Sequence, residues 1–519
     1  MSKKRYMAAC LAVLMAGTML CSCSSPSGES SSGSSDSTAD EPRDVTITYL
    51  YADNTSYPYK EDWPVFDWIK EATGVTLDLT VVPDADYETK VPLMLNSADC
   101  PDILGKWAPT NNDDCFNGVY LPISDYEDQL PNYTAFLEES GMRAEIDGTR
   151  LSDGKYYSLP TCARSTTIQD QQWIIRADIF EKNNIPVPTT MDELYEAGKK
   201  LKELYPDSTP ITNRFGSGNI MAAFAGGFGT IAGWSNCDML YDWETETWEY
   251  APATDNWKDM ITYVNKLYTE GILDKEYATQ DSAVYEERIV NGTTFIMYDW
   301  VTNITRYDPV GKEKDPDFEL VTIVPPKGPE GDYAVRPLHQ WQQNVTLPAK
   351  VKDQDNFEDI LRFIDWCYTD EAEMLLTFGI EGETYEKNEE GRYVFLPDEN
   401  GNAVDTMSVY GIYNNSLTFR QHIDSILGAL DDASYEAFEK IDELNCVPMP
   451  NPASPLSAEQ NEYVSTFSSS LTDYVNSSME QMIMGTMPLS DWDTFVQNCM
   501  DKGAQKMIDA YKEVATVKE

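Results

Sequence analysis

The pattern of apolar and polar positions separates the first 43 residues from the rest of the chain. Residues 7–20 are mostly apolar and follow three cations, Lys3, Lys4 and Arg5. This apolar run is shorter than the roughly 20 residues that a membrane-spanning helix requires. Residues 24–42 carry no large apolar side chain, so they cannot bury enough surface to offset the entropy of ordering. We therefore expect folded structure only from residue 44 on.

From residue 44 the chain alternates between a period of two and a helical period. The pattern predicts strands at 44–51, 75–83 and 101–107 and helices at 63–74 and 86–99. Strands that alternate with helices are typical of an α/β lobe with a largely parallel sheet. Ligands of such sheets bind beyond the carboxyl ends of the strands.

A second group of elements begins near residue 153. "DGKYYSLP" predicts a turn and a strand, "QQWIIR" (171–176) another strand, and 188–204 a helix capped by Thr190 with Glu193 three residues later. Residues 287–300 predict a helix end, a glycine turn and a strand that stops at Trp300, and the last third is mostly helical. "DENGN" (398–402) has its glycine at the wrong place for a calcium loop. We interpret it as a turn, and expect no metal and no cofactor.

The amino terminus has the layout of a secretory signal peptide, with a charged head, a short apolar run and then small residues. "LCSC" (20–23) resembles a bacterial lipobox with Cys23 at the lipid-bearing position. We expect a signal peptide at 1–22, then the lipidated Cys23 and a disordered tether over 23–43, a coil of roughly 25 Å end to end. The alternative is ordinary cleavage with a free amino terminus.

Composition narrows the function classes. The net charge of −50 argues against a nucleic acid partner and against anionic membrane surfaces. Three of the ten cysteines lie in the signal region. The remaining seven show no CxxC, and among them Cys100 with Cys115 is the only close pair that could form a disulfide. Two histidines argue against a histidine-rich zinc site and a Ser-His-Asp triad. The 12 Trp and 31 Tyr residues suit a sugar or peptide cleft, because their rings are apolar with a polar handle.

Four segments together resemble the lipid-anchored solute-binding proteins of bacterial ABC importers, family 1, the LplA-like lipoproteins. They are "DGKYYSLP", "WIIRADIFEKNNIPVPTTMDEL", "FIDWCYTDEAEMLLTFGIEGETYE" and "MIMGTMPLSDWDTFVQNCMDKGAQKMIDAY", and they occur in the family's order. The resemblance implies a periplasmic-binding-protein-like fold of type II, with two α/β lobes, a hinge and a ligand cleft between them. It implies no catalytic residue. On this basis we expect an N-terminal lobe of 44–163 plus 300–340 and a C-terminal lobe of 164–299 plus 341–519.

Trp300 is the leading candidate for ligand contact. Sugar rings stack their C–H faces on aromatic rings and pair their hydroxyls with polar side chains. Trp300 ends the strand "FIMYDW", where the resemblance implies a hinge crossing and a ring that faces the cleft; the alternative is a core position. Tyr298 and Asp299 are weaker candidates, because alternation along a strand sends neighbours to opposite faces.

Several loops add further candidates for ligand contact. Asp53 and Asn54 follow the first strand, or form a solvated loop, and Trp107 follows the third. Trp234 lies in the glycine-rich "FGTIAGW", and Trp341 lies near the third crossing that the resemblance implies.

Two charged residues complete the set. Arg164 follows the first crossing strand, where it could hold a carboxylate such as a uronic acid or form a structural ion pair. Glu381 in "GIEGE" could contact the ligand or only order its loop.

The sequence therefore predicts a monomeric, lipid-anchored binding protein on the outer face of a bacterial membrane. Its expected partners are an oligosaccharide ligand, the membrane lipid and an ABC permease pair. A peptide or other small polar solute is the rival ligand. A secreted glycoside hydrolase would need two carboxyl groups across a cleft, and no carboxylate motif stands out among 88 acidic residues. A surface adhesin would need repeats or a flat apolar patch, and neither is visible.

Overall fold

The computed structural model describes residues 44–513 with short gaps. The gaps are 55–56, 96, 98, 106–111, 163–170, 234–238, 330–331, 336–340, 390, 400–403, 413–416, 423, 429, 450 and 453–455. The predicted signal peptide, Cys23 and the tether lie outside the described residues. None of the helices in the described part is long and apolar enough to cross a membrane.

The first sheet is a mixed, five-stranded sheet. Strands β2, β1 and β3 are parallel, as the sequence predicts, whereas β11 is antiparallel to both β3 and β4. In spatial order its strands are β2 (Val75–Pro83), β1 (Val45–Asp53), β3 (Ile103–Leu104), β11 (Trp341–Thr346) and β4 (Ser158–Cys162).

Helices cover both faces of this sheet because β1 is apolar on both faces. Ile47, Tyr49 and Tyr51 enter one hydrophobic core and Leu50 and Ala52 enter another, which is the burial expected of a strand between two helical layers. On the first face lie α1 (Pro64–Thr73), α4 (Pro131–Glu139), α5 (Arg143–Gly148), α12 (Phe357–Trp366) and α13 (Asp370–Phe378), and on the second α2 (Asp84–Leu95) and α3 (Asn112–Phe116).

The second sheet has four strands and carries Trp300. β5 (Gln171–Arg176) is antiparallel to both β10 (Leu320–Thr322) and β9 (Ile296–Trp300), and β6 (Ile211–Thr212) is parallel to β9. Trp173 and Ile175 of β5 face one core and Ile174 faces the other, so this sheet is also covered on both sides.

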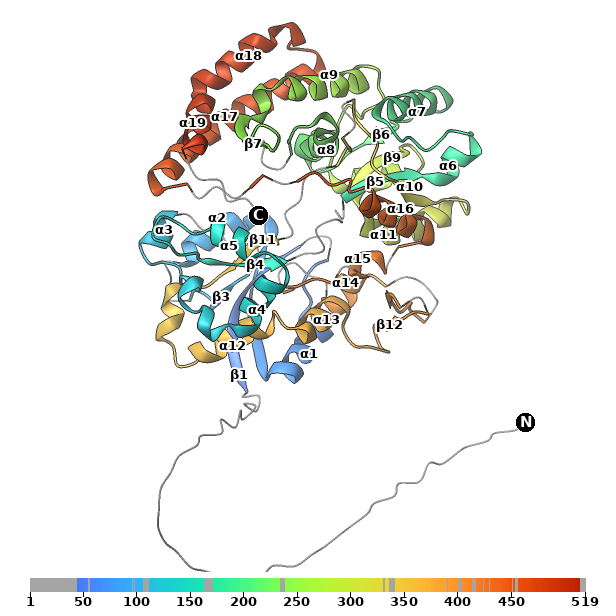
Figure 1. Ribbon diagram of the computed structural model, residues 1–519. Helices are drawn as coiled ribbons and strands as arrows, with labels where there is room; N and C mark the ends of the chain where they lie inside the picture. The colour runs from blue at the N-terminus through green and yellow to red at the C-terminus, as the bar shows by residue number, and fades with distance from the viewer. Residues whose placement is uncertain are drawn as a thin grey trace, which may run out of the picture. The chain divides into compact units, whose positions relative to one another are not determined.

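The larger core of the second sheet joins early and late helices. Figure 1 shows α17 and α18, in red, beside α9, in green. Its elements are α6 (Ala177–Lys182), α7 (Met191–Leu204), α8 (Gly216–Ala225), the hairpin β7 (Met239–Asp242) and β8 (Thr247–Tyr250), α9 (Asp255–Thr269), α17 (Ala458–Met484), α18 (Trp492–Cys499) and α19 (Gln505–Lys512).

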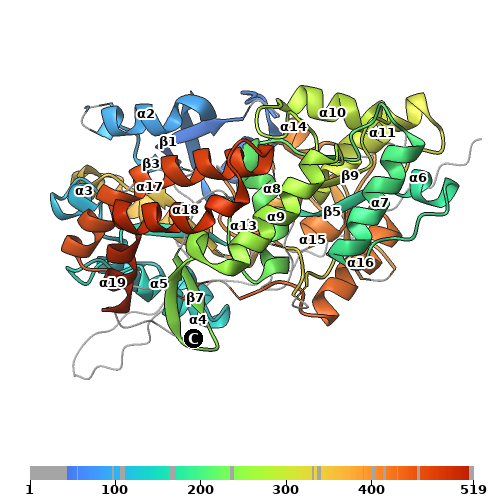
Figure 2. The same cartoon turned by 90° about the horizontal axis from the view of Figure 1, so that it is seen from above.

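The core on the other face of the second sheet is smaller. Figure 2 shows two of its helices, α10 and α11, side by side. Its helices are α10 (Ser282–Val290), α11 (Ile304–Lys314), α15 (Asp424–Leu427) and α16 (Asp432–Glu443). The hairpin β12 (Tyr385–Lys387) and β13 (Tyr393–Phe395) and α14 (Thr406–Tyr410) lie between α13 and α15 in the chain.

The sheets divide the chain differently from the predicted lobe bounds in two segments. β10, which lies within 300–340, pairs with β5 in the second sheet, and β11, which lies within 341–519, pairs with β4 in the first. The chain therefore passes between the sheets after β10 and not at Trp300. The sequence did not reveal this crossing point because it depends on β10, whose three residues are too few for a recognisable strand pattern.

Local signals account for several element ends. Gly74 ends α1 at φ 73°, a left-handed conformation that glycine adopts without strain. The predicted cap of α7 is confirmed, since the Thr190 side chain accepts from the Glu193 backbone N–H at 3.2 Å. The Glu193 carboxylate bonds to Thr189 rather than to the cap residue. Cys100 and Cys115 are free, buried thiols, so the pair forms no disulfide.

One helix depends on a cap supplied by another segment. Asp365 in α12 accepts hydrogen bonds from the Asn132 and Tyr133 backbone N–H groups at 2.8 and 3.0 Å, in the first turn of α4. Burial raises the pKa of the Asp365 carboxyl, although these hydrogen bonds oppose the shift. The Asn132 side chain adds a third hydrogen bond at 2.7 Å.

Replacing this carboxylate should destabilise the protein. Asp365→Ala leaves the two backbone N–H groups without their acceptor, so we expect the free energy of unfolding in urea to fall by about 2 kcal/mol. Glu439→Ala, at an exposed position of α16, serves as the control and should change it by less than about 0.5 kcal/mol. Equal effects would show that Asp365 does not act as the cap of α4.

Candidate functional site

Two aromatic rings meet at the end of β9. Trp300 is half-buried, and Phe215 packs against it edge-on, with ring centroids 5.6 Å apart and an interplanar angle of 85°. Phe215 is 45% exposed, an unusual position for a large apolar ring. We call Phe215 and Trp300 the aromatic platform.

The platform forms because two parallel strands end at the same edge of the sheet. β6 runs parallel to β9 and stops at Thr212, after which the chain turns through Asn213 and Arg214 into α8. Phe215 closes this turn at φ 64°, a left-handed conformation that costs a side chain roughly 1–2 kcal/mol. The strained turn brings the Phe215 ring against Trp300.

A buried ion pair lies behind the platform. The Arg214 side chain is 5% exposed and that of Asp299 0%, and the Arg214 Nη2 donates to Asp299 Oδ1 at 2.7 Å. The guanidinium centre lies 4.7 Å from the Phe215 ring centroid and 5.6 Å from that of Trp300, within the range of cation–π attraction. Burial alone would lower the pKa of Arg214, but Asp299 and its neighbours raise it overall, so the guanidinium stays charged.

Two tyrosines donate to the other carboxylate oxygen. The hydroxyls of Tyr285 and Tyr307 lie 3.1 and 3.0 Å from Asp299 Oδ2. Burial, followed by the charge of Asp299, raises the pKa of both phenols. Both therefore remain protonated donors.

A second buried polar chain lies beside the platform. Gln171 is opposite Trp300 in the β5–β9 register, and its Nε2 donates to Asn219 Oδ1 at 3.1 Å. Asn219 Nδ2 in turn donates to Asn213 Oδ1 at 2.9 Å. All three residues are buried, so this chain fixes the start of α8 beneath the platform.

The structure places the other predicted residues of β9 away from solvent. Tyr298 is 1% exposed and packs on Trp173 in the core, with ring centroids 5.6 Å apart. Asp299 is occupied by the ion pair. Of the three candidates at the end of this strand, the structure leaves the Trp300 side chain partly open to solvent.

The candidates at the end of β1 form hydrogen bonds with the following loop and with the start of α2. The Asp53 carboxylate accepts from the Tyr59 backbone N–H at 2.7 Å, and Asn54 Nδ2 donates to Asp84 at 3.0 Å. Glu381 is exposed and forms an isolated β-bridge with Tyr385. Trp107, Trp234 and Arg164 lie outside the described residues, as does the side chain of Trp341 on β11.

Sequence reasoning missed Arg214 and Phe215. A usable signal was present, because "NRFGSGN" (213–219) places an arginine and a phenylalanine in a glycine-containing turn directly after a short strand. The two-residue strand β6 is too short to mark the turn by its pattern.

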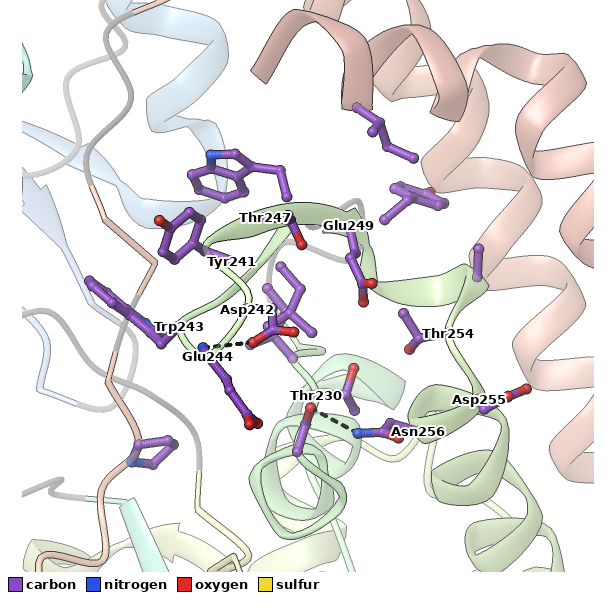
Figure 3. A pocket seen from close by; sticks show the side chains of 18 of the residues that line it. Thr230, Tyr241, Asp242, Trp243, Glu244, Thr247, Glu249, Thr254, Asp255 and Asn256 are labelled. Carbon is purple, nitrogen blue, oxygen red and sulfur yellow. Dashed lines mark hydrogen bonds between the residues drawn. The ribbon is translucent and has the colours of Figure 1, made fainter. Parts of the chain in front are cut away.

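A separate pocket lies at the β7–β8 hairpin. It has a volume of about 1060 Å³ and is lined by the hairpin, the start of α9, Pro448, Met449 and α19. Figure 3 shows Tyr241 and Thr247 on one side and Thr230 and Asn256 on the other. Its charged lining residues are Asp242, Glu244, Glu249, Asp255, Asp332 and Lys512.

This acidic lining favours neutral or cationic groups over anions. The Asp242 carboxylate accepts from Thr245 and from the Glu244 backbone N–H, and these hydrogen bonds lower its pKa. None of the predicted site residues in the described part lines this pocket. The described residues hold no group of three or more His, Cys, Asp or Glu side chains placed to bind a metal.

The aromatic platform therefore lies at the edge of the second of two helix-covered sheets. The chain matches, over residues 52–374, the family model of the bacterial extracellular solute-binding proteins, and it belongs to that family. It has the mixed α/β fold of the type II periplasmic solute-binding proteins.

Characterised relatives are similar over most of their length. The polygalacturonan/rhamnogalacturonan-binding protein YtcQ of Bacillus subtilis is 25% identical over 455 residues, which cover 86% of each chain. The fructooligosaccharide ABC transporter substrate-binding protein FusA of Streptococcus pneumoniae is 22% identical over 386 residues, 70% of this chain and 67% of FusA.

A solved structure has a similar fold. The alginate-binding protein AlgQ2 superimposes with a TM-score of 0.71 at 19% identity, over 91% of this chain and 98% of that one. At this identity, the likeness shows the fold.

The left-handed turn predicts an unusual order of stability. The free energy of unfolding in urea should be about 1 kcal/mol higher for Phe215→Gly than for Phe215→Ala, because glycine adopts this φ without strain and alanine does not. Val310, on α11, has the same exposure of 45%. There the order should reverse, with the glycine variant about 1 kcal/mol less stable than the alanine variant. The same order at both positions would contradict the strained turn.

Proposed function

We propose that this protein captures an extracellular carbohydrate, in particular an oligosaccharide, and delivers it to the permease of an ABC importer. The observation that carries the proposal is the aromatic platform at the strand ends of a chain that belongs to the solute-binding family. Flat rings stack on sugar C–H faces. The names of two relatives, YtcQ and FusA, specify carbohydrate ligands and support the same class.

The proposed mechanism is capture followed by closure. A sugar binds at Trp300, and the two lobes close around it; only a ligand that binds the closed state more tightly can drive this closure. The other predicted contacts are Trp107, Trp234, Trp341, Asp53, Asn54, Arg164 and Glu381. The closed, monomeric protein then docks on the permease pair, which moves the sugar inward.

Lipidation at Cys23 is part of the proposal. An acyl anchor followed by a polar segment would keep the protein near its permease at high effective concentration and still let it rotate. The segment 24–42 has the composition of a flexible linker. The protein would then act on the outer face of the cell membrane.

A thermal-shift screen of the chain from Ser24 on tests the carbohydrate class. Panels of pectic, fructan and host oligosaccharides, with peptides as a second panel, should give a shift with one glycan class and no hydrolysis product after incubation. A ligand at 100 times its dissociation constant stabilises by about 2.7 kcal/mol. A shift with peptides alone would replace the sugar by a peptide, and product formation would make the protein a hydrolase.

Trp300 should be essential for tight binding. Trp300→Ala removes one stacking face, so we expect the dissociation constant measured by calorimetry to rise at least about tenfold, or about 1.4 kcal/mol. The half-buried position of Trp300 predicts little loss of thermal stability. Trp366→Ala provides a control, because Trp366 is partly buried against the core that covers the first sheet and not at the platform. This variant should leave the dissociation constant unchanged. An unchanged affinity in Trp300→Ala would remove this residue from the site.

A further inference from the structure

We infer that Asp299 is a positioning residue for ligand binding: it touches no ligand but fixes the Trp300 and Phe215 rings through its hydrogen bonds and its ion pair. The inference rests on the proposed function for the ligand, whereas its geometric part stands on the structure of the free protein. Asp299 is 0% exposed, so a ligand at the platform cannot reach its carboxylate directly.

The two oxygens of Asp299 hold different parts of the site. Oδ1 accepts from the Trp300 backbone N–H at 2.8 Å, from Arg214 Nη2 at 2.7 Å and from Asn303 Nδ2 at 3.2 Å. Oδ2 accepts from Tyr285 and Tyr307. Oδ1 therefore faces the platform, and Oδ2 ties it to α10 and α11.

Only a carboxylate satisfies this set of donors. An asparagine offers one acceptor oxygen and turns an NH₂ group toward the remaining donors. The charge is also required, because Arg214 is buried and without Asp299 would keep only the more distant Glu286 carboxylate, 4.0 Å from its Nη1. Asp299→Asn therefore removes the anion while it keeps the size of the side chain.

The ion pair is coupled to both rings. Arg214 precedes Phe215 in the left-handed turn, and its guanidinium lies against both the Phe215 and the Trp300 rings. If the Asp299 carboxylate is removed, the Arg214 guanidinium is stabilised by moving toward water. The two rings that it contacts, Phe215 and Trp300, would then have to shift with it. Loss of Asp299 should therefore loosen the two rings before it loosens the rest of the sheet.

The same sheet contains a matched control. Arg176 and Asp178 form a buried ion pair with side chains 3% and 9% exposed and an Nη2–Oδ2 distance of 2.7 Å. Arg176 also lies on an aromatic ring, 4.0 Å from the Phe318 centroid. Its backbone N–H bonds to Phe295, so this pair lies at the opposite end of β9 from the platform. Asp178→Asn thus removes an equivalent charge far from the rings.

The first experiment is hydroxyl-radical footprinting of the free full chain, read by mass spectrometry. In Asp299→Asn, oxidation of Trp300 should rise severalfold over wild type, and that of Phe215, which is already 45% exposed, should rise less, while Trp173, which is fully buried, stays protected. In Asp178→Asn, the oxidation of Trp300 should not change. An unchanged rate at Trp300 in folded Asp299→Asn protein would overturn the inference, whatever the ligand is.

The second experiment is a double-mutant cycle in calorimetry, with oligogalacturonides and fructooligosaccharides as probes. Asp299→Asn should raise the dissociation constant of the probe that binds by about tenfold, or about 1.4 kcal/mol. It should cost no further affinity in a Trp300→Ala, Phe215→Ala background, because coupled residues are not additive. An additive loss would mean that Asp299 acts by another route, and the inference would fail.

Two controls keep the outcomes distinct. Asp178→Asn should lower the melting temperature and leave the affinity for the probe unchanged. If it lowers the affinity as much as Asp299→Asn does, Asp299 only stabilises the fold and does not position the rings. If Asp299→Asn does not fold, Arg214→Met with Asp299→Asn leaves no unpaired buried charge, and oxidation of Trp300 should still rise, because the cation–π contacts of Arg214 with both rings are lost. If wild type binds no glycan, the proposed function fails, and the footprint still decides the position of the rings.

Discussion

The aromatic platform depends on one buried ion pair, between Arg214 and Asp299. Removing two charges from water is costly, and a buried pair is weak evidence of added stability. This pair instead specifies geometry, because it joins the end of β9, the turn after β6 and two helices, α10 and α11, through a single carboxylate. It thus sets the position of two rings that the core itself does not hold.

The two sheets provide the frame for this arrangement. Each is covered by helices on both faces, so only the strand ends and the loops between them remain for a ligand. The polar chain from Gln171 to Asn213 and the strained turn at Phe215 both lie at such an end. The acidic pocket at the β7–β8 hairpin belongs to a different part of the chain, and its charge distinguishes it from the platform.

Much of the fold could be predicted because its signals are local. The β-branched and aromatic residues of β1, the glycine after α1 and the threonine before α7 each act within a few residues. The strands divide between the sheets differently from the predicted lobe bounds where the signal was short, since β10 has three residues and its partner β5 lies more than 140 positions earlier. In the candidate site, Trp300 was recognisable as a tryptophan at a strand end, but its partner Phe215 comes from a turn 85 residues earlier in the chain.

The sequence by itself determined the longer elements, the acidic charge, the layout of the amino terminus and the family, because each depends on residues close together in the chain or on motifs in a fixed order. Only the tertiary structure decided which side chains meet. It sent Tyr298 into the core and made Asp299 the partner of Arg214. The physical reason is that burial and ion pairing depend on distances across the fold, which strand pairing and helix packing set and which spacing along the chain does not encode.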